Sequence, residues 1–294
     1  MPKLYHKRHK NEFSSIIKTM KKILAVSGGI DSVVMLHLLK GEYPIVAHFD
    51  HGIRPNSHED AEFVERLAKE YGLVFEVKHA KLGENCGEAT ARAARYDFLQ
   101  EIAKKYKGIV CVAHHADDVV ESVAINLIRG TGWRGLAPMN SANIERPLLE
   151  WRKSDVYRYA TEHNLSFRQD QTNTEGDYLR NRVREKLRDL PEENKQRLLE
   201  LYKKQSALLE EYAGIMRVIF SNNDSHCAKN IVVDSPDECA TEIVRFFLAE
   251  QQISLTRPQL EKCVDAIKNF APGKRLSLDR KHFLEVGKYS FHVI

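Results

Sequence analysis

The chain has 294 residues, 43% hydrophobic and 29% charged, which is typical of a soluble globular protein with one large domain or two ordinary ones. It contains no apolar run near the roughly 18 residues that a membrane helix needs, and its basic N-terminal segment lacks the apolar core of a signal peptide. We therefore expect a cytoplasmic protein with no membrane partner. Its five cysteines include no C-x-x-C pair, which argues against disulfides, structural zinc and sulfur carriage.

The charge is distributed unevenly along the chain. The net charge of the chain is +4. The stretch from Arg129 to Arg188 contains twelve Lys and Arg against eight Asp and Glu, so its excess of positive charge equals the net charge of the whole chain. A polyanion such as RNA would be met there. A solvated charged surface is the alternative.

The first half of the chain alternates short apolar runs with helical patterns. Strands are predicted at 23–26, 44–49, 73–77 and 108–115, and apolar residues recur at helical spacing between them. This alternation predicts βαβ units around a buried parallel sheet, which is a doubly wound α/β fold.

The second half changes character after a charged amphipathic segment at 191–215, which predicts a helix ending at Gly214. We place a domain boundary there. The predicted organisation is a catalytic domain over 1–190, a helical linker over 191–215, and a small α+β domain over 216–294. This last domain should contain two helices and an antiparallel meander with its final turn at 287–288.

Polar clusters follow three of the predicted strands. SGGIDS (27–32) follows the first strand, Asp50 and His51 follow the second, and HHADD (114–118) follows the fourth. Because the carboxyl ends of parallel strands lie at one edge of a sheet, we expect these clusters to share a site.

The SGGIDS loop predicts an anion site at a helix N-terminus, with a plain strand–helix turn as the alternative. Paired glycines let backbone N–H groups approach phosphate, and the two serines add hydroxyl donors. A Walker loop would supply a lysine, but here the loop supplies an aspartate. A carboxylate beside polyphosphate requires a bridging Mg²⁺, so cleavage of an α–β phosphate bond is expected. The expected ATP-binding residues are Ser27, Gly28, Gly29, Ile30, Asp31 and Ser32.

The loop, preceded by ILAV, resembles the PP-loop of the N-type ATP pyrophosphatases, which cut ATP to AMP and pyrophosphate. Four further segments, at 47–60, 88–99, 113–139 and 146–184, are similar to the tRNA(Ile)-lysidine synthetase family. The resemblance covers roughly 20–190. It implies a Rossmann-like PP-loop fold, ATP and Mg²⁺ as cofactors, and two partners: free L-lysine and tRNA(Ile) with a CAU anticodon.

The resemblance also implies a reaction, the ligation of lysine to C2 of the wobble cytidine. ATP adenylates the C2 carbonyl oxygen, and the lysine amine displaces AMP to give lysidine. Asp31 would orient Mg²⁺, and His115 with Asp118 would serve in catalysis, although strand alternation leaves His114 as an alternative. The residues expected to contact lysine or AMP are Arg92, Arg95, Asp117 and Glu121.

Two segments of the first domain are expected to bind the RNA, a glycine-hinged loop at 129–136 and a helix at 178–188, and the small domain over 216–294 is also expected to bind tRNA. A tryptophan flanked by arginines would stack on an unpaired base, with packing inside the loop as the alternative. The expected tRNA-binding residues are Arg129, Trp133, Arg134, Arg180, Arg182 and Arg184. The oligomeric state is open, with a homodimer among the options.

Three other functions are less well supported. A PP-loop tRNA thiolase usually needs a cysteine pair, which is not present. An amide-forming relative such as NAD synthetase shares the loop but not the segments DHGIRPNSHED and GTGWRGL. A catalytically inactive RNA-binding protein is disfavoured because Asp31 and the HHADD cluster are intact.

Overall fold

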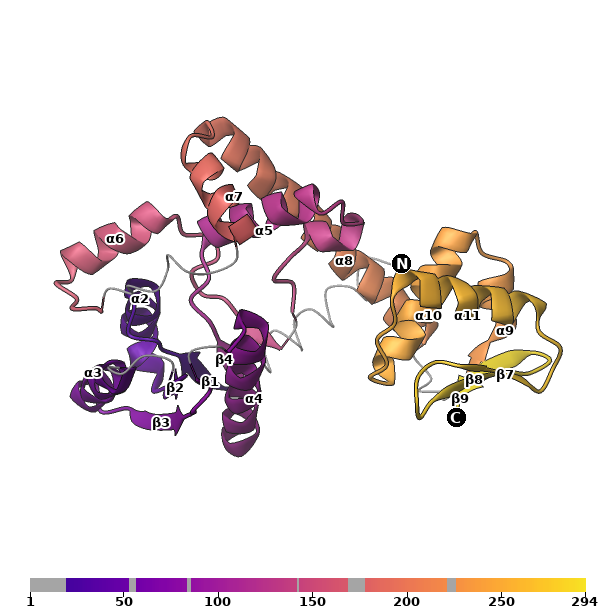
Figure 1. Ribbon diagram of the computed structural model, residues 1–294, viewed down its shortest axis with the longest axis horizontal. Helices are drawn as coiled ribbons and strands as arrows, with labels where there is room; N and C mark the ends of the chain where they lie inside the picture. The colour runs from indigo at the N-terminus through magenta and orange to yellow at the C-terminus, as the bar shows by residue number, and fades with distance from the viewer. Residues whose placement is uncertain (1–19, 53–56, 84–85, 142, 169–177, 221–225) are drawn as a thin grey trace, which may run out of the picture. The chain divides into compact units, whose positions relative to one another are not determined.

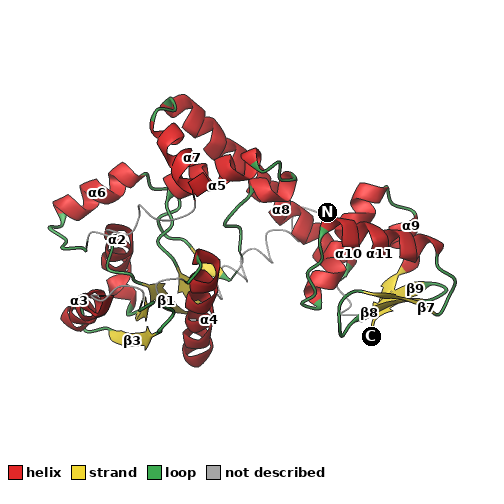
Figure 2. Ribbon diagram, in the orientation of Figure 1, coloured by secondary structure: helices red, strands yellow, loops and turns green. Residues whose placement is uncertain are grey.

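The computed structural model describes residues 20–52, 57–83, 86–141, 143–168, 178–220 and 226–294 (Figure 1). The chain divides into two compact units, the first ending at Ala207 and the second beginning at Leu208. Each unit has its own sheet, as the two groups of strands in Figure 2 show.

The first unit is built on a five-stranded parallel sheet with the order β3-β2-β1-β4-β5. Its strands are β1 (Lys21–Ala25), β2 (Ile45–Asp50), β3 (Val74–His79), β4 (Gly108–Cys111) and β5 (Ile144–Glu145). β1 lies in the centre, where Ile23 pairs with Ile45 on one side and with Val110 on the other. Every residue of β2 is buried, as expected for a strand covered on both faces.

Helices cover both faces of this sheet, which confirms the predicted doubly wound fold. Adjacent residues of β1 point in opposite directions, so that Leu24 joins the core on one face and Ile23 joins the core on the other. Three helices pack on the Leu24 face and a fourth packs on the Ile23 face. The helices on the Leu24 face are α2 (Ile30–Leu39), α3 (Ser57–Glu70) and α6 (Lys153–Glu162). The helix on the Ile23 face is α4 (Glu88–Tyr106).

A third group of helices forms a separate core in the first unit. α5 (Ala116–Ile128) follows β4 but packs with α7 (Tyr178–Arg188) and with the first part of α8 (Glu192–Ile219) (Figure 1). Their shared core contains Val119, Val120 and Val123 from α5 and Leu199 and Tyr202 from α8. A short 3₁₀-helix, η2 (Trp133–Leu136), follows α5.

The second unit contains a four-stranded antiparallel sheet with the order β6-β9-β8-β7 and three helices. The elements are β6 (His226–Ala228), α9 (Lys229–Val233), α10 (Asp237–Glu250), α11 (Arg257–Asn269), β7 (Lys274–Ser277), β8 (Phe283–Val286) and β9 (Ser290–Val293). The predicted meander is confirmed, with its final turn at Gly287 and Lys288 between β8 and β9.

Several elements differ from the sequence-based expectation, including β4, which ends at Cys111 instead of residue 115, and the additional helix α9. The predicted end of α8 at Gly214 is wrong, because the helix continues to Ile219. Met216 explains the extension, since it lies in the core of the second unit and burial of its side chain favours a further helical turn. β5 and β6 have only two and three residues, too few for an alternating pattern to reveal. The proposed division into 1–190, 191–215 and 216–294 remains a prediction.

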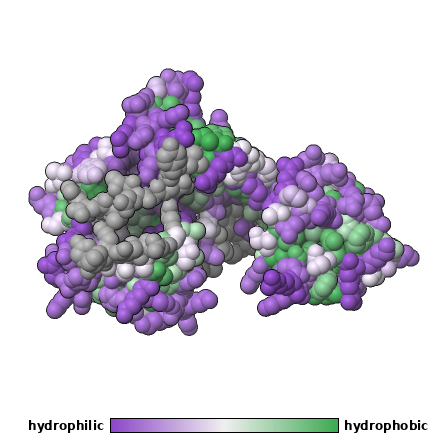
Figure 3. Space-filling model, viewed as in Figure 1, coloured by the Kyte–Doolittle hydropathy of each residue, from purple (hydrophilic) through white to green (hydrophobic). Residues whose placement is uncertain are grey.

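Hydrophilic residues dominate the face shown in Figure 3, and apolar residues reach it in limited patches. Large exposed apolar side chains include Leu127 and Ile128 at the end of α5 and Val218 and Ile219 at the end of α8. Among the residues that the structure describes, no helix combines the length and apolar character needed to cross a membrane.

We expect Phe291→Ala to lower the free energy of unfolding of the second unit by about 3–5 kcal/mol, because it opens a cavity in a closed core. Phe291 is 0% exposed and packs edge-on against Phe247, with ring centroids 5.1 Å apart. Tyr289→Ala is the matched control, since Tyr289 is an aromatic residue that is 75% exposed, and it should change stability by about 0.5 kcal/mol or less. Urea titration followed by circular dichroism measures both, and equal effects would contradict the assigned core.

Candidate functional site

The phosphate loop closes around a serine hydroxyl. Oγ of Ser32 accepts the N–H groups of Ser27 and Gly28, each at 3.2 Å, and donates to the carbonyl oxygen of Gly29 at 2.8 Å. Gly28 has φ +92°, a conformation that strains any other residue. A Cβ on Gly29 would meet only Oγ of Ser27, at 3.5 Å, so the loop is open beside this residue. The loop is therefore preformed, with room for a close ligand at Gly29.

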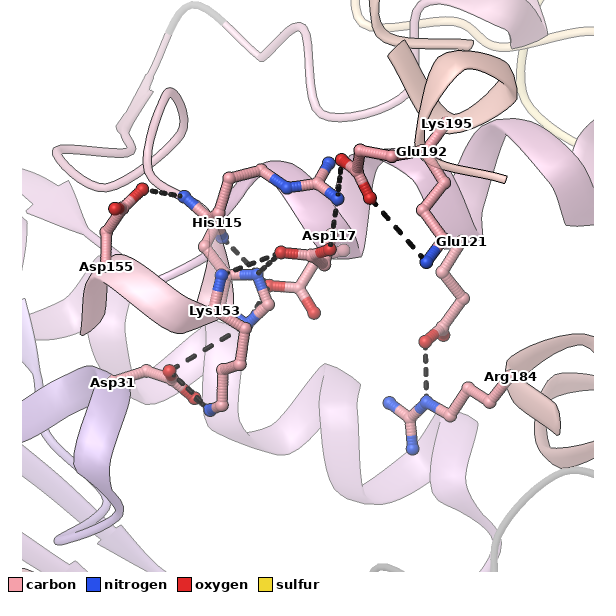
Figure 4. Close-up of polar contacts among 11 residues, drawn as sticks. Asp31, His115, Asp117, Glu121, Lys153, Asp155, Arg184, Glu192 and Lys195 are labelled. Atoms are coloured by element: carbon pink, nitrogen blue, oxygen red, sulfur yellow. Dashed lines mark hydrogen bonds and ion pairs between the residues drawn. The ribbon is translucent and has the colours of Figure 1, made fainter. Parts of the chain in front are cut away.

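Asp31, the second residue of α2, is paired with a lysine far away in the sequence. Nζ of Lys153 donates to both carboxylate oxygens of Asp31, at 2.6 and 2.8 Å (Figure 4). Lys153 is the first residue of α6. The ion pair therefore joins the beginnings of two helices at the end of the phosphate loop.

His115 lies between the carboxylates of the site. It precedes α5 and is 6% exposed, with Nε2 3.8 Å from Oδ1 of Asp31 and 3.6 Å from Oδ2 of Asp118. The other ring nitrogen, Nδ1, is 3.8 Å from Oδ2 of Asp117. The structure thus brings together the predicted residues Asp31, His115, Asp117 and Asp118.

The Asp118 carboxyl is perturbed by its surroundings. Oδ2 of Asp118 accepts the main-chain N–H of His115 at 2.9 Å, in the manner of a helix N-terminal cap. Burial raises the pKa of Asp118, the carboxylates of Asp31 and Glu121 raise it further, and His115 opposes the shift. A carboxyl with a raised pKa is suited to proton transfer nearer neutral pH.

Asp117 ties α5 to the start of α6. Its Oδ2 accepts the main-chain N–H of Lys153 at 2.7 Å, and its Oδ1 lies 3.2 Å from Nη2 of Arg152. The same Arg152 nitrogen is 2.5 Å from Oε1 of Glu192, the first residue of α8 (Figure 4). Asp117 therefore positions Lys153 through its backbone while Lys153 reaches Asp31 through its side chain.

His114 faces a different environment from its neighbour. Burial lowers the pKa of His114 to about 3, and the positive charges of Arg146, Arg92 and Arg95 contribute to this shift. Nδ1 of His114 and Nε of Arg146 are buried without a hydrogen-bond partner among the residues the structure describes. The predicted strand over 108–115 ends earlier, because β4 stops at Cys111. The two histidines still face different groups, His115 the carboxylates and His114 the arginines.

Arg92 and Arg95 lie one turn apart on α4 and share an aromatic neighbour. Their guanidinium carbons are 5.0 and 5.5 Å from the centroid of the Tyr96 ring. Burial lowers the pKa of His51 at the end of β2, with a further contribution from Arg95. This side of the sheet edge is therefore cationic, which suits an anionic group.

Glu121 anchors α7 to α5. It is 6% exposed, and its two oxygens accept Nε–H of Arg180 and Nε–H of Arg184 at 2.5 Å each. Figure 4 shows the contact with Arg184. The two arginines lie on one helical face, as expected from their spacing. Contact of Glu121 with lysine, and of Arg180 and Arg184 with RNA, remain predictions.

The remaining candidate RNA-binding residues of the first unit lie at the end of α5, in the loop that follows it, and on α7. Trp133 is half-buried, and the guanidinium carbon of Arg134 lies 4.9 Å from its ring centroid. Nδ2 of Asn126 donates to the carbonyl oxygen of Gly135 at 2.7 Å, which ties the loop to α5. Arg129, at the end of α5, and Arg182, on α7, are exposed. Their contact with RNA stays a prediction.

Sequence reasoning missed four basic residues at the site. Lys153 and Arg152 contact the carboxylates, and Arg146 lies beside His114. The main-chain N–H of Arg168 donates to the carbonyl oxygen of Gly28 at 2.9 Å, and its side chain is bound by Glu59 and Asp60 of α3. The sequence held one clue to the role of Lys153. A lysine in the first turn of a helix lies beside the positive end of the helix dipole, which is unfavourable unless a carboxylate is close to it.

The residues at the loop fit a magnesium ion that arrives with phosphate. Within the described ranges, no three His, Cys, Asp or Glu side chains are arranged to hold a metal by themselves. Magnesium commonly uses one or two carboxylates together with substrate phosphates. Asp31 supplies such a carboxylate two residues after the open position at Gly29.

The five cysteines do not form a cluster. Cys111, Cys227 and Cys263 are buried, Cys86 is partly buried and Cys239 is exposed, and all are free thiols. Burial raises the pKa of Cys227 to about 12 and that of Cys263 to about 11, and it also raises the pKa of Cys111. Protonated thiols of this kind are poor nucleophiles and poor metal ligands.

Comparison with solved structures confirms the α/β fold of the first unit. The chain superimposes on a U34-tRNA thiolase, NcsA from Methanococcus maripaludis, with a TM-score of 0.56 and 21% sequence identity, covering 65% of this chain and 72% of the thiolase. That structure contains a [4Fe-4S] cluster. At this level of identity, the similarity concerns the fold alone.

Curated relatives share more sequence. A tRNA(Ile)-lysidine synthase from Thermotoga maritima is 38% identical over 186 residues, covering 58% of this chain and 45% of the relative. Another from Clostridium acetobutylicum is 29% identical over 301 residues, covering 91% of this chain and 64% of the relative. The chain thus matches less than two thirds of the length of either relative. The resemblance predicted from the motifs is confirmed.

The family comparison covers the first unit almost completely. Residues 3–191 match the PP-loop domain family, a span that contains the phosphate loop, the carboxylates around His115 and the start of α6. These residues and the parallel sheet that positions them place the chain in the PP-loop domain family.

Proposed function

We propose that the protein ligates free lysine to C2 of the wobble cytidine in tRNA(Ile) with a CAU anticodon, with cleavage of ATP to AMP and pyrophosphate. One observation carries the proposal: His115, Asp118 and Asp31 meet at the phosphate loop of a chain whose curated relatives are named tRNA(Ile)-lysidine synthase. Because the substrate is a tRNA, the proposed location is the cytoplasm.

The phosphate loop would hold the nucleotide. The open position beside Gly29, at the N-terminus of α2, lets polyphosphate approach backbone N–H groups and the positive end of the helix dipole. Asp31 would hold Mg²⁺ against the phosphates, where the ion supplies charge neutralisation for the departing pyrophosphate. The ammonium of Lys153, which contacts Asp31 in the structure, would supply a second positive charge to the phosphates.

In the first step, the C2 carbonyl oxygen of cytidine attacks the α-phosphorus and pyrophosphate leaves. In the second step, the lysine amine forms a bond to C2, and the C2–oxygen bond breaks so that the oxygen departs with AMP. The amine must be neutral to attack. We expect His115 and Asp118 to take its protons, since Nε2 of His115 lies 3.6 Å from Oδ2 of Asp118 and burial raises the pKa of the Asp118 carboxyl.

Free lysine carries positive ammonium groups and a negative carboxylate. The site contains side chains of the opposite charge for each. The carboxylates of Asp117 and Glu121 suit an ammonium group, and Arg92 and Arg95 suit a carboxylate or the AMP phosphate. Glu121 already binds two arginines of α7, so a lysine ammonium there would have to share or replace them.

The RNA would lie on the arginine-rich elements that follow α5. Trp133, held near Arg134, offers an aromatic face for an unpaired base, and Arg129 and Arg182 offer charge for phosphates. Exposed basic residues of the second unit, Lys262, Lys274 and Arg275, would also contact the tRNA. The proposal does not depend on the oligomeric state, and a homodimer is one option.

We expect ATP cleavage to require RNA but not lysine. If the RNA is the group that is activated, pyrophosphate release needs a tRNA(Ile) transcript with cytidine at the wobble position, and lysine serves only to discharge the adenylated RNA. Changing that cytidine to uridine should suppress release, because uridine keeps the C2 carbonyl but replaces the exocyclic amine, a hydrogen-bond donor, with a carbonyl acceptor. Pyrophosphate exchange with lysine and ATP alone would contradict the proposal.

Asp31→Asn should lower the rate of RNA-dependent pyrophosphate release by about 100-fold or more, because a neutral amide no longer holds the metal on the phosphates. Binding of tRNA should stay within a few-fold of wild type, since the proposed RNA surface lies on other elements. Asp265→Asn, at an exposed carboxylate on α11, is the control and should change neither quantity. Filter binding and a pyrophosphate assay on the same preparations measure the two effects.

A double variant, Cys86→Ser with Cys239→Ser, should keep full activity in the same assay. These are the two cysteines whose side chains are not buried, and lysine ligation uses no sulfur. A thiolase would depend on an accessible thiol. Loss of activity with an unchanged circular dichroism spectrum would revive the thiolase interpretation.

A further inference from the structure

Three helices begin at the candidate site. α2 begins at Ile30, α5 at Ala116 and α6 at Lys153. The contacts of Lys153 show that the three beginnings are adjacent, since its N–H reaches Asp117 near the start of α5 and its Nζ reaches Asp31 near the start of α2. Helix N-termini favour anions, so three of them together suit polyphosphate and do not suit a lysine.

Lys153 is nevertheless held firmly at this position. Its backbone is fixed by Oδ2 of Asp117, and its ammonium is shared between both oxygens of Asp31 at 2.6 and 2.8 Å. The ring of Tyr157, one turn later on α6, lies 5.3 Å from Nζ. The side chain therefore spans from α6 to the carboxylate that is expected to hold a metal (Figure 4).

An ammonium group and a divalent cation compete for the same carboxylate. Mg²⁺ binds oxygen at about 2.0–2.1 Å, closer than an ammonium nitrogen, and two cations at one carboxylate repel each other strongly at such separations. The other charged groups nearby are already in contact with one another: Asp118 with His115, and Asp117 with Arg152. A metal ion arriving alone would have to displace Lys153 from Asp31.

A metal ion that arrives together with the phosphates of ATP does not face the same competition with Lys153. The phosphates of ATP supply several negative oxygens, so the ammonium of Lys153 can move from Asp31 to a phosphate oxygen and remain paired. The metal can then be shared between Asp31 and the phosphates. No cation is left without a partner at any stage.

We propose that Lys153 is a positioning residue that excludes divalent metal from Asp31 until a polyphosphate binds. Its ammonium neutralises Asp31 in the free protein and transfers to phosphate when the nucleotide arrives. The inference rests on the ATP chemistry of the proposed function, but it involves neither the RNA nor the free L-lysine substrate. It makes metal binding conditional on nucleotide binding.

The test uses the full chain and two titrations without RNA. The first measures binding of Mn²⁺ alone, from the electron paramagnetic resonance signal of the free ion. Lys153→Met should bind one Mn²⁺ about tenfold more tightly than wild type, because the competing charge is gone. The second measures a non-cleavable ATP analogue, α,β-methylene ATP, by calorimetry with Mg²⁺. Lys153→Met should bind it about tenfold more weakly, because a charge-assisted contact to phosphate is lost.

The opposite signs of these two changes distinguish positioning from a structural role, which would weaken both. Adding Asp31→Asn to Lys153→Met should abolish the gain in Mn²⁺ affinity. Lys105→Met is the matched control, since Lys105 pairs with Glu76 at 2.7 Å on other elements, and it should change neither titration. Lys153→Gln is the second variant in case the first fails to fold. If both folded variants bind Mn²⁺ as wild type does, the proposal is wrong, whatever the enzyme's RNA substrate proves to be.

Discussion

The central strand β1 hydrogen-bonds to β2 on one side and to β4 on the other, and its carboxyl end leads directly into the phosphate loop. Because the sheet is parallel, the carboxyl ends of these three strands are forced to the same edge. The loop after β1, His51 after β2 and the paired histidines after β4 are therefore neighbours through topology alone. Moving any one of them would require breaking a ladder of buried backbone hydrogen bonds.

Three carboxylates near that edge have cationic partners in the structure. Asp31 is paired with Lys153, Asp117 with Arg152, and the buried Glu121 with two arginines of α7. Buried or half-buried carboxylates need such partners, since an isolated one costs several kcal/mol. A cationic ligand at these carboxylates would therefore have to share or replace an existing cation.

How much of this could be predicted from sequence depended on the distance over which each signal acts. The phosphate loop was predictable because its residues are consecutive. Strand alternation indicated only that His114 and His115 face opposite ways, and it left open which of them acts in catalysis. The pairing of Asp31 with Lys153 was not predictable, because 122 residues separate them and only the return of the chain through β5 brings them together. The spacing of Arg180 and Arg184 showed that they share a face, but their common partner Glu121 is set by helix packing. Met216 decided the end of α8 through a core that no local pattern reveals.

The buried thiols have a consequence for the chain under oxidative stress. Cys111 ends β4 and lies in the core on one face of the parallel sheet, and Cys227 and Cys263 lie in the core of the second unit, all with raised pKa values. Peroxide reacts with the thiolate form, so these three side chains are poor targets for sulfenic acid formation. Oxidants would meet the exposed Cys239 and the partly buried Cys86 first. Damage would then begin at the surface of α10 and in the segment before α4, while both hydrophobic cores keep their sulfur atoms reduced.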